Sequence, residues 1–202
     1  MLLAIDTSAG TSVAVVDREG GVLSEIIETD TMRHAEVIGT LIDEALTVAG
    51  IEVRALSGVV AGMGPGPFTG LRIGIAAARA FAIGRGIPVV PVASHDAAAF
   101  EILEQDPEAE FVIVTDARRR ENAVSAYAGL KGGLPNRIAG PDLRPHTEDP
   151  QTAPALTTAI PAVQLARIAA RQLKEGATEH VDPLYLRAPD AKIPGAVKRV
   201  ST

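Results

Sequence analysis

A glycine- and proline-rich stretch between two apolar runs limits the possible folds of this chain more than any other feature. Residues 61–74, AGMGPGPFTGLRIG, contain five glycines and two prolines. They follow the apolar residues Val59 and Val60 and lead into an apolar run that ends at Gly84. This pattern predicts a buried strand, a tight loop and a helix with its N-terminus at Thr69. Strand–loop–helix units of this kind are typical of α/β folds.

The loop matches neither of the common phosphate-binding motifs. A Walker loop needs a lysine after its last glycine, and no lysine precedes Lys131 in the chain. The dinucleotide motif G-x-G-x-x-G, begun at Gly62 or Gly64, needs a third glycine where Pro67 or Thr69 stands. A helix N-terminus can still bind an anion, so two interpretations remain open: a structural turn and a ligand-binding loop.

Strand and helix patterns surround this unit in a regular order. Three strand-like runs come first and indicate a meander: residues 2–6, 11–17 and 22–29. A helix follows, with Asp30 or Thr31 as its expected N-cap and Gly50 as its stop. The run PVVPV at residues 88–92 indicates a further strand after the glycine-rich unit. The predicted order of the first half is therefore βββαβαβ.

The second half begins like the first. FVIVTD at residues 111–116 ends in an aspartate, as the first strand-like run ends in Asp6. The pair Gly132 and Gly133 follows at nearly the spacing that separates Gly20 and Gly21 from Asp6. We interpret this as an internal duplication, with chance similarity between two hairpins as the alternative.

Beyond this repeated meander, the second half is expected to be reduced. The segment between Pro135 and Pro161 is polar and proline-rich, and it shows no clear strand. A helix at 161–176 and a last strand at 183–187 follow. The predicted division is a first lobe at 1–105, a second, reduced lobe at 106–190 and a mobile tail at 191–202.

Charge and composition exclude several classes of function. The net charge of −6 and the pI near 5.2 repel nucleic acid phosphates, so any contact with nucleic acid must be local or made by a partner. The chain has no cysteine, which excludes disulfides and thiolate metal sites. The N-terminal apolar run is broken at Asp6, too early for a signal peptide, and no apolar run reaches membrane length. A cytoplasmic location is expected.

Four segments together resemble one known family. They are AIDTS at 4–8, GMGPGPFTGLRIG at 62–74, DARRRE at 116–121 and PLYLRAPDA at 183–191. In these segments, which span nearly the whole chain, the sequence resembles the TsaB (YeaZ) family, and the long glycine motif is the most specific of them. The resemblance implies an α/β, actin-like fold of the sugar kinase and Hsp70 superfamily (ASKHA). Two lobes of βββαβα plan, the second reduced, agree with the duplication inferred above.

The same resemblance implies a role in tRNA modification. Members of the family are non-catalytic subunits in the formation of threonylcarbamoyladenosine beside the tRNA anticodon. A member activates and dimerises with a catalytic sister, TsaD, and a small ATPase, TsaE, joins them. The expected partners are therefore a TsaD-type subunit, a TsaE-type ATPase and, for the isolated chain, a second copy. Contact with tRNA is expected only through the complex, and no contact with a membrane is expected.

The resemblance also indicates where a nucleotide would lie. Asp6, Thr7 and Ser8 stand where actin-like ATPases surround phosphates and metal, and Asp116 stands at the equivalent turn of the second half. The first three residues are thus predicted to be a vestigial nucleotide loop, with capping of a strand end as the alternative. No cofactor is expected, and a nucleotide at the partner interface is left open. Without a Walker lysine and with a reduced second lobe, ATPase activity should be negligible.

A metal site is not expected either. The catalytic sister holds its metal through an H-x-x-x-H motif after the strand that follows the second helix. His95 stands in that stretch, but Ala99 takes the place of the second histidine. No two of the four histidines, at positions 34, 95, 146 and 180, have the spacing that puts two imidazoles one helical turn apart. His34 lies beside the apolar stripe of its helix and is interpreted as a packed or hydrogen-bonded residue.

Two other functions are alternatives to the non-catalytic subunit. One is an autonomous, ATP-dependent phosphotransferase of the sugar kinase type, and the other is a metalloprotease, which the missing histidine pair disfavours. The basic run Arg118–Arg120 is expected in a hairpin turn, where we interpret it as solvated, with contact to tRNA or a partner as the alternative.

The helix after the glycine-rich loop is apolar on nearly all sides. Between Gly70 and Gly84 only Arg72 and Arg79 are polar. A helix of this kind is expected to be covered on two sides, by the protein's own core and by a second subunit. The predicted partner interface consists of Val37, Leu41, Glu44, Arg72, Ile75, Ala76, Arg79 and Ile83.

Overall fold

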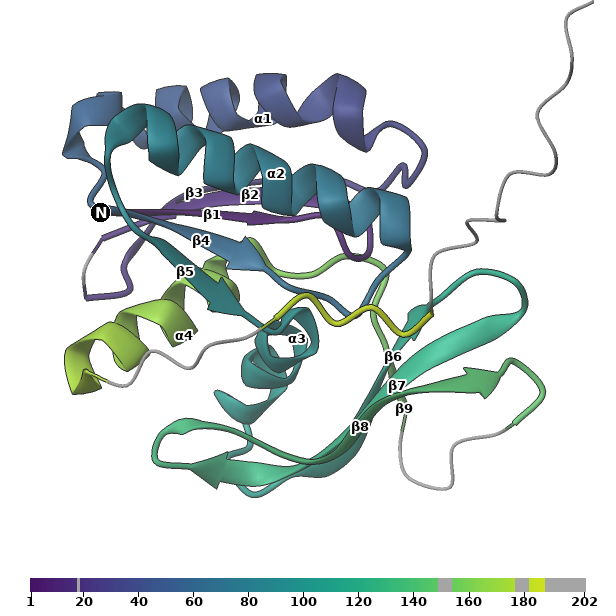
Figure 1. Ribbon diagram of the computed structural model, residues 1–202. Helices are drawn as coiled ribbons and strands as arrows, with labels where there is room; N and C mark the ends of the chain where they lie inside the picture. Colours follow the sequence, from purple (N-terminus) through teal and green to yellow (C-terminus); the bar gives the residue numbers. More distant parts are fainter. Residues whose placement is uncertain (18, 149–153, 177–181, 188–202) are drawn as a thin grey trace, which may run out of the picture.

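The computed structural model describes residues 1–17, 19–148, 154–176 and 182–187, arranged in four layers (Figure 1). Helices α1 and α2 cover one face of a five-stranded sheet, and helices α3 and α4 lie between its other face and a four-stranded sheet. The elements in chain order are β1 (Leu2–Asp6), β2 (Thr11–Val16), β3 (Val22–Glu28), α1 (His34–Ala49), η1 (Val53–Ala55), β4 (Gly58–Gly62), α2 (Phe68–Arg85), β5 (Val89–Val92), α3 (Ser94–Leu103), β6 (Glu110–Asp116), β7 (Glu121–Lys131), β8 (Leu134–Pro145), β9 (Pro154–Leu156) and α4 (Ala162–Glu175).

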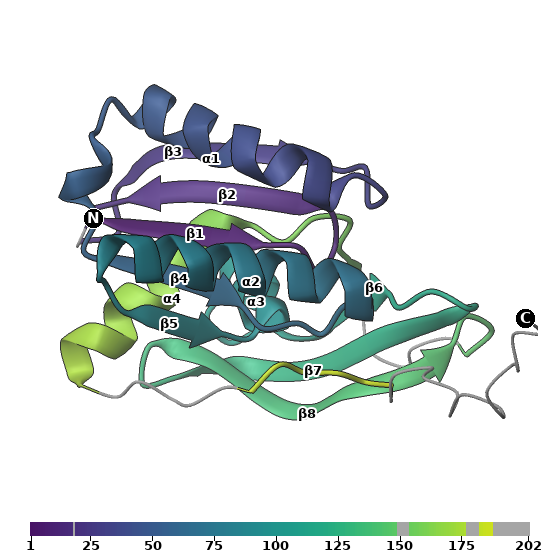
Figure 2. The same ribbon diagram turned by 45° about the horizontal axis from the view of Figure 1, so that its top comes forward.

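The first sheet has the strand order β3-β2-β1-β4-β5, with β1 parallel to β4 and antiparallel to β2. Its central strands are covered on both faces, which is why they are continuous apolar runs. Leu3 and Ile5 pack toward α1 and α2, whereas Leu2 and Ala4 pack toward α3 and α4. Figure 2 shows α1 and α2 side by side on the outer face. The predicted βββαβαβ order is confirmed.

The second sheet, β8-β7-β6-β9, repeats the centre of the first one. β6 pairs antiparallel with β7 and parallel with β9, as β1 pairs with β2 and β4. The expectation of no clear strand between Pro135 and Pro161 is wrong, because this segment contains most of β8 and the whole of β9. β8 is an edge strand with an exposed side, so backbone pairing forms it without an apolar pattern. Only residues 146–153 separate β8 from β9, too few for a counterpart of the 16-residue α1.

Two helix starts differ from the sequence prediction. α1 has Arg33 as its N-cap, whereas Asp30 accepts the backbone N–H of Met32 at 2.9 Å in the preceding turn. The expected N-cap at Asp30 or Thr31 is therefore wrong. α2 starts at Phe68, one residue before the predicted position, and the left-handed Gly50 ends α1 as predicted.

Helix α3 was not predicted, and the expected strand at 183–187 is absent. α3 is buried on nearly every side, so its sequence lacks the amphipathic period that marks a helix. Residues 182–187 are irregular, although the N–H of Leu184 donates to the carbonyl of Met63 at 2.8 Å. The predicted tail at 191–202 lies outside the described residues, and the division into lobes at residue 105 stays a prediction.

The predicted partner interface on α1 and α2 is wrong at two of its eight residues. Ile75 is 5% exposed and Leu41 is 8% exposed, and both pack between the helices and the first sheet. Gly70 and Gly74 also face inward, but they have no side chain that could fill the core. The neighbouring Leu71 and Ile75 fill it instead, so the inward face of α2 is centred on these two residues. The other predicted interface residues are half-buried or exposed: Val37, Glu44, Arg72, Ala76, Arg79 and Ile83.

No helix among the described residues is long and apolar enough to pass through a bilayer.

Candidate functional site

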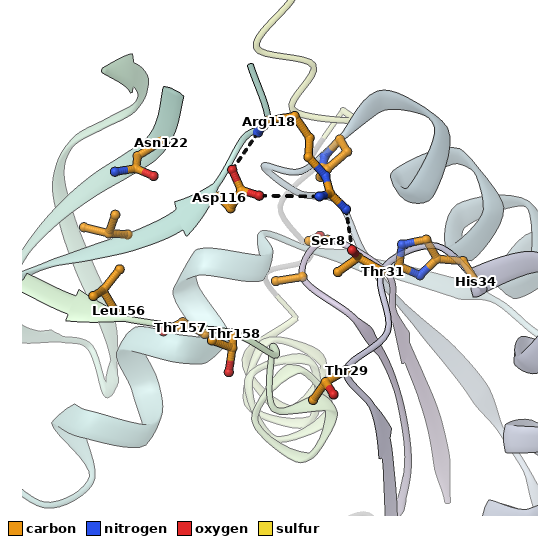
Figure 3. A pocket seen from close by; sticks show the side chains of 13 residues that line it. Ser8, Thr29, Thr31, His34, Asp116, Arg118, Asn122, Leu156, Thr157 and Thr158 are labelled. Atoms are coloured by element: carbon orange, nitrogen blue, oxygen red, sulfur yellow. Dashed lines mark hydrogen bonds and ion pairs between the residues drawn. The ribbon is translucent and has the colours of Figure 1, made fainter. Parts of the chain in front are cut away.

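A cavity of about 540 Å³ opens between the two sheets, beyond the carboxyl ends of β1 and β6 (Figure 3). Ligands of open α/β sheets bind at this edge, because the loops there are free to vary. The first half contributes Ser8, Ala9, Thr29, Thr31, His34 and Pro67 to its walls. The second half contributes Val114, Asp116, Arg118, Asn122, Leu156, Thr157 and Thr158. The walls thus combine several hydroxyls with one carboxylate and one guanidinium, which suits a polar ligand.

Arg118 joins the two sides of this cavity. Its backbone N–H donates to Oδ1 of Asp116 at 2.9 Å, and its Nη1 lies 3.7 Å from Oδ2 of the same carboxylate. Its Nη2 donates to the hydroxyl of Thr31, which precedes α1 (Figure 3). The guanidinium therefore spans from the β6–β7 turn to the first half of the chain.

Asp6 lies at the centre of a buried network instead of facing the cavity. Its side chain is 1% exposed. Oδ1 accepts the N–H of Ser8 at 2.7 Å, and Oδ2 accepts the hydroxyl of Ser94 at 2.5 Å. The same Ser94 hydroxyl accepts the N–H of Gly64 at 2.9 Å. The carboxyl group thereby ties the β1–β2 turn, the glycine-rich loop and the start of α3 together.

Burial also changes the acidity of this carboxyl group. Loss of water raises the pKa of Asp6 from an ordinary 3.8 to about 6, against the opposing effect of the hydrogen bonds from Ser94 and Ser8. A carboxyl group in this state cannot reach a ligand in the cavity without breaking the network.

Thr7 has a similar structural role. Its hydroxyl donates to the carbonyl of Gly70 at 2.7 Å and accepts the N–H of Gly74 at 3.1 Å. Cβ atoms at Gly66 and Gly74 would overlap Ser8 and Thr7 respectively. The glycine-rich stretch is therefore explained by close packing against the β1–β2 turn, which is the structural interpretation of the loop.

His34 is buried at the side of the cavity, at the start of α1. Its Nδ1 lies 2.8 Å from the hydroxyl of Thr11. Burial first, and then the positive charge of Arg118, lowers the pKa of His34 below its usual range. The prediction of a hydrogen-bonded, packed histidine is confirmed.

His95 lies on α3 with both ring nitrogens occupied. Nδ1 is 2.8 Å from the hydroxyl of Ser125 and Nε2 is 2.9 Å from the hydroxyl of Thr115. Burial, followed by the charge of Arg137, lowers the pKa of His95 to about 3. Ala99, one turn further along the helix, is fully buried. The residues of α3 do not fit a metal centre, and no cluster of three potential metal ligands occurs in the described ranges.

Comparisons with known proteins agree with this arrangement. Residues 5–141 match the family model of TsaD, tRNA N6-adenosine threonylcarbamoyltransferase. An uncharacterized protein of Mycobacterium tuberculosis is 36% identical over 215 residues, which cover 95% of this chain and 93% of that protein. The tRNA threonylcarbamoyladenosine biosynthesis protein TsaB of Haemophilus influenzae is 36% identical over 121 residues, covering 59% of this chain and 50% of that protein. The chain belongs to the TsaB/YeaZ family.

The solved structure of YeaZ from Pseudomonas aeruginosa shares the fold. It superposes with a TM-score of 0.75 at 24% identity, covering 92% of this chain and 99% of the other. The mixed α/β architecture with two sheets, expected for an actin-like protein, is thus confirmed.

Only part of the predicted site faces the cavity of this TsaB/YeaZ protein. Of Asp6, Thr7 and Ser8, only Ser8 lines it. Sequence reasoning missed the second wall, formed by Asn122 and the residues from Leu156 to Thr158. The duplication was the signal that could have located this wall, because the residues after β9 take the place that residues after β4 hold in the first half.

Proposed function

We propose that this protein is a non-catalytic, partner-activating subunit of the complex that forms threonylcarbamoyladenosine beside the tRNA anticodon. It would dimerise with a TsaD-type catalytic sister, with a TsaE-type ATPase as the third component. Membership of the TsaB/YeaZ family supports this assignment, and so does the similarity to a tRNA threonylcarbamoyladenosine biosynthesis protein of Haemophilus influenzae.

The observation that carries the proposal is the state of α3. In the catalytic sister, the equivalent stretch would hold a metal between two histidines one turn apart. Here the single histidine, His95, is held by Thr115 and Ser125, and Ala99 fills the other position. A helix of this composition supports the packing of the second sheet and leaves chemistry to a partner.

The β1–β2 turn supports the same conclusion. A phosphotransferase needs a carboxylate and hydroxyls around the phosphates, whereas Asp6 and Thr7 are engaged in internal hydrogen bonds. A nucleotide in the cavity would meet Ser8 and Arg118 but would not reach the Asp6 carboxylate. No observation among the described residues favours an autonomous kinase.

Reconstitution tests the proposal. Purified TsaD-type and TsaE-type subunits from the same organism should modify tRNA in the presence of this chain and should lose most activity without it. The chain alone should neither modify tRNA nor turn over ATP at a typical enzymatic rate of about 10 per second. Full modification without the chain would contradict the assignment, and so would phosphorylation of a sugar by the chain alone.

The exposed faces of α1 and α2 are the proposed docking surface for the partner. Ile83 is 81% exposed, and Ala76 and Arg79 are exposed beside it on α2. Glu44 and the half-buried Val37 extend this face onto α1, which packs beside α2 (Figure 2). Large exposed apolar side chains on a helix that is otherwise packed are typical of an interface.

Charge substitutions on this face should weaken association. Ala76→Glu and Ile83→Glu should each cost roughly 2 to 5 kcal/mol of binding to the TsaD-type subunit, because a carboxylate would be buried without a partner. The matched control is Ile138→Glu on β8, where the side chain is 61% exposed on the second sheet. Calorimetric titration measures the affinities, and circular dichroism checks that each variant is folded. Equal affinities for all three variants would place the interface elsewhere.

A further inference from the structure

The β6–β7 turn has a conformation that its residue types disfavour. Arg118, Arg119 and Arg120 have φ angles of 64°, 57° and 63°, in the left-handed region. Non-glycine residues pay a steric penalty there, because Cβ approaches the following carbonyl oxygen. Three such residues in succession are rare, since glycine or asparagine would form the turn without this penalty.

Several contacts hold the turn in this conformation. The N–H of Ala117 donates to the carbonyl of Glu121 at 2.9 Å, and the N–H of Glu121 donates to the carbonyl of Arg118 at 3.1 Å. The guanidinium of Arg187 donates to the carbonyls of Ala117 and Arg118, at 2.8 Å and 3.1 Å, and to the carboxylate of Glu121. Strained backbone that the surroundings enforce in this way is concentrated at functional sites.

The turn presents positive charge on an otherwise acidic protein. Residues 1–105 hold 13 acidic and six basic side chains, whereas residues 106–202 hold 12 acidic and 13 basic ones. Arg118, Arg119 and Arg120 are all exposed. Within the part of the chain that the structure describes, the Arg120 side chain forms no ion pair, so its guanidinium is open to an anion from outside.

The position of the turn suits contact with a substrate of the complex. The second sheet lies on the far side of the first sheet from α1 and α2 (Figure 1), and the turn meets the first half at Thr31, just before α1 starts. The exposed Arg119 and Arg120 are therefore not part of the proposed docking surface on α1 and α2. Guanidinium groups bind phosphate through paired hydrogen bonds, and backbone phosphates dominate the affinity of proteins for RNA.

We propose that Arg119 and Arg120 bind the phosphate backbone of RNA, with Arg118 and Arg187 as the residues that hold the turn in place. The proposal rests on the proposed function, because tRNA is the RNA that the complex would present to this surface. The contact is local, which agrees with the net charge of −6.

Glycine substitutions separate this role from a structural one. Arg119→Gly and Arg120→Gly remove the guanidinium and relieve the left-handed strain, so the melting temperature should stay the same or rise by about 2 °C. The affinity of the complex with the TsaD-type subunit for tRNA should fall several-fold for each variant. The slope of log affinity against log salt concentration should become shallower by about 1 per arginine. Arg119→Lys and Arg120→Lys, which keep the charge, should retain the slope.

The control is Arg54→Gly in the first half, where an exposed arginine pairs with Glu52. Its salt slope should equal that of the unmodified protein. An unchanged slope for both turn variants would overturn the proposal. A loss of affinity for the TsaD-type subunit, with tRNA binding unaffected, would also overturn it and would identify the turn as a protein contact. A complex with the natural sequence that binds tRNA but does not modify it would instead contradict the proposed function alone.

Discussion

Replacement of Gly74 by alanine is expected to lower the free energy of unfolding by about 3 kcal/mol. A Cβ atom at this position would overlap the side chain of Thr7, whose hydroxyl bonds both Gly70 and Gly74. The methyl group therefore overpacks a closed site and displaces a buried hydroxyl from its partners, and each effect costs about 1 to 3 kcal/mol. Chemical denaturation followed by circular dichroism measures the change.

Gly84→Ala on the same helix is the matched control. A Cβ atom at Gly84 meets no other atom within 4 Å, and the residue is exposed. Alanine there should stabilise the protein by roughly 0.5 to 1 kcal/mol, because it restricts the unfolded chain and favours the helix. If both variants shift the unfolding midpoint in the same direction, the close packing of α2 against the β1–β2 turn is not what requires glycine at position 74.

Replacement of Asp6 by asparagine is expected to change how stability depends on pH. The pKa of Asp6 is about 6 in the folded protein and near 3.8 when the chain unfolds, so between these values the folded state binds one more proton than the unfolded state. This carboxyl group therefore adds stability as the pH falls from 6 to 4. Asparagine does not titrate, so the stability of the variant relative to the natural protein should fall by about 2 kcal/mol between pH 7 and pH 4.

His95 has the opposite effect over the same interval. Its pKa is about 3 when folded and 6.5 when unfolded, so the unfolded state binds one more proton and stability is lost as the pH falls from 6.5 toward 3. Between pH 4 and pH 6 the contributions of Asp6 and His95 to the pH dependence of stability nearly cancel in the natural protein. Asp6→Asn should expose the His95 effect as a loss of about 1.4 kcal/mol per pH unit.

Urea denaturation at intervals from pH 4 to pH 7 measures both curves. Asp43→Asn, on the exposed face of α1, is the control for removal of a carboxylate and should follow the natural protein. A constant difference between the Asp6→Asn variant and the natural protein at all pH values would mean that the Asp6 carboxyl group is in contact with water.

Local sequence patterns determined the first half of the fold. Continuous apolar runs bounded by turns located β1, β2, β4 and β5, and Gly50 marked where α1 stops. The expected end of α2 at Gly84 is wrong, because the helix continues to Arg85 and the left-handed Gly86 caps it. The repeated spacing of Asp6 and Asp116 from their glycine pairs indicated a second copy of the meander, and the sequence located its first two strands, β6 and β7, but not β8. These features depend on residues near one another in the chain, so they are visible without a structure.

Tertiary contacts decided the remaining elements. β8 exists because its backbone pairs with β7, and α3 is a helix without amphipathic pattern because both neighbouring layers bury it. The orientation of α2 depends on Thr7, more than sixty residues earlier in the chain, which fits only against the glycines of that helix.

Some features of the candidate site were likewise determined by the sequence, and others only by the tertiary structure. The sequence by itself determined that α3 lacks a second histidine one turn after His95, because spacing along a helix is a local property. It also placed Asp6, Thr7 and Ser8 together at the end of a strand. Only the tertiary structure decided that the Asp6 carboxyl group is turned into a buried network with Ser94 while Ser8 faces the cavity. Whether a side chain faces a ligand or the core depends on groups that are distant in sequence and adjacent in space, and the free energy of burying a charge is set by those groups.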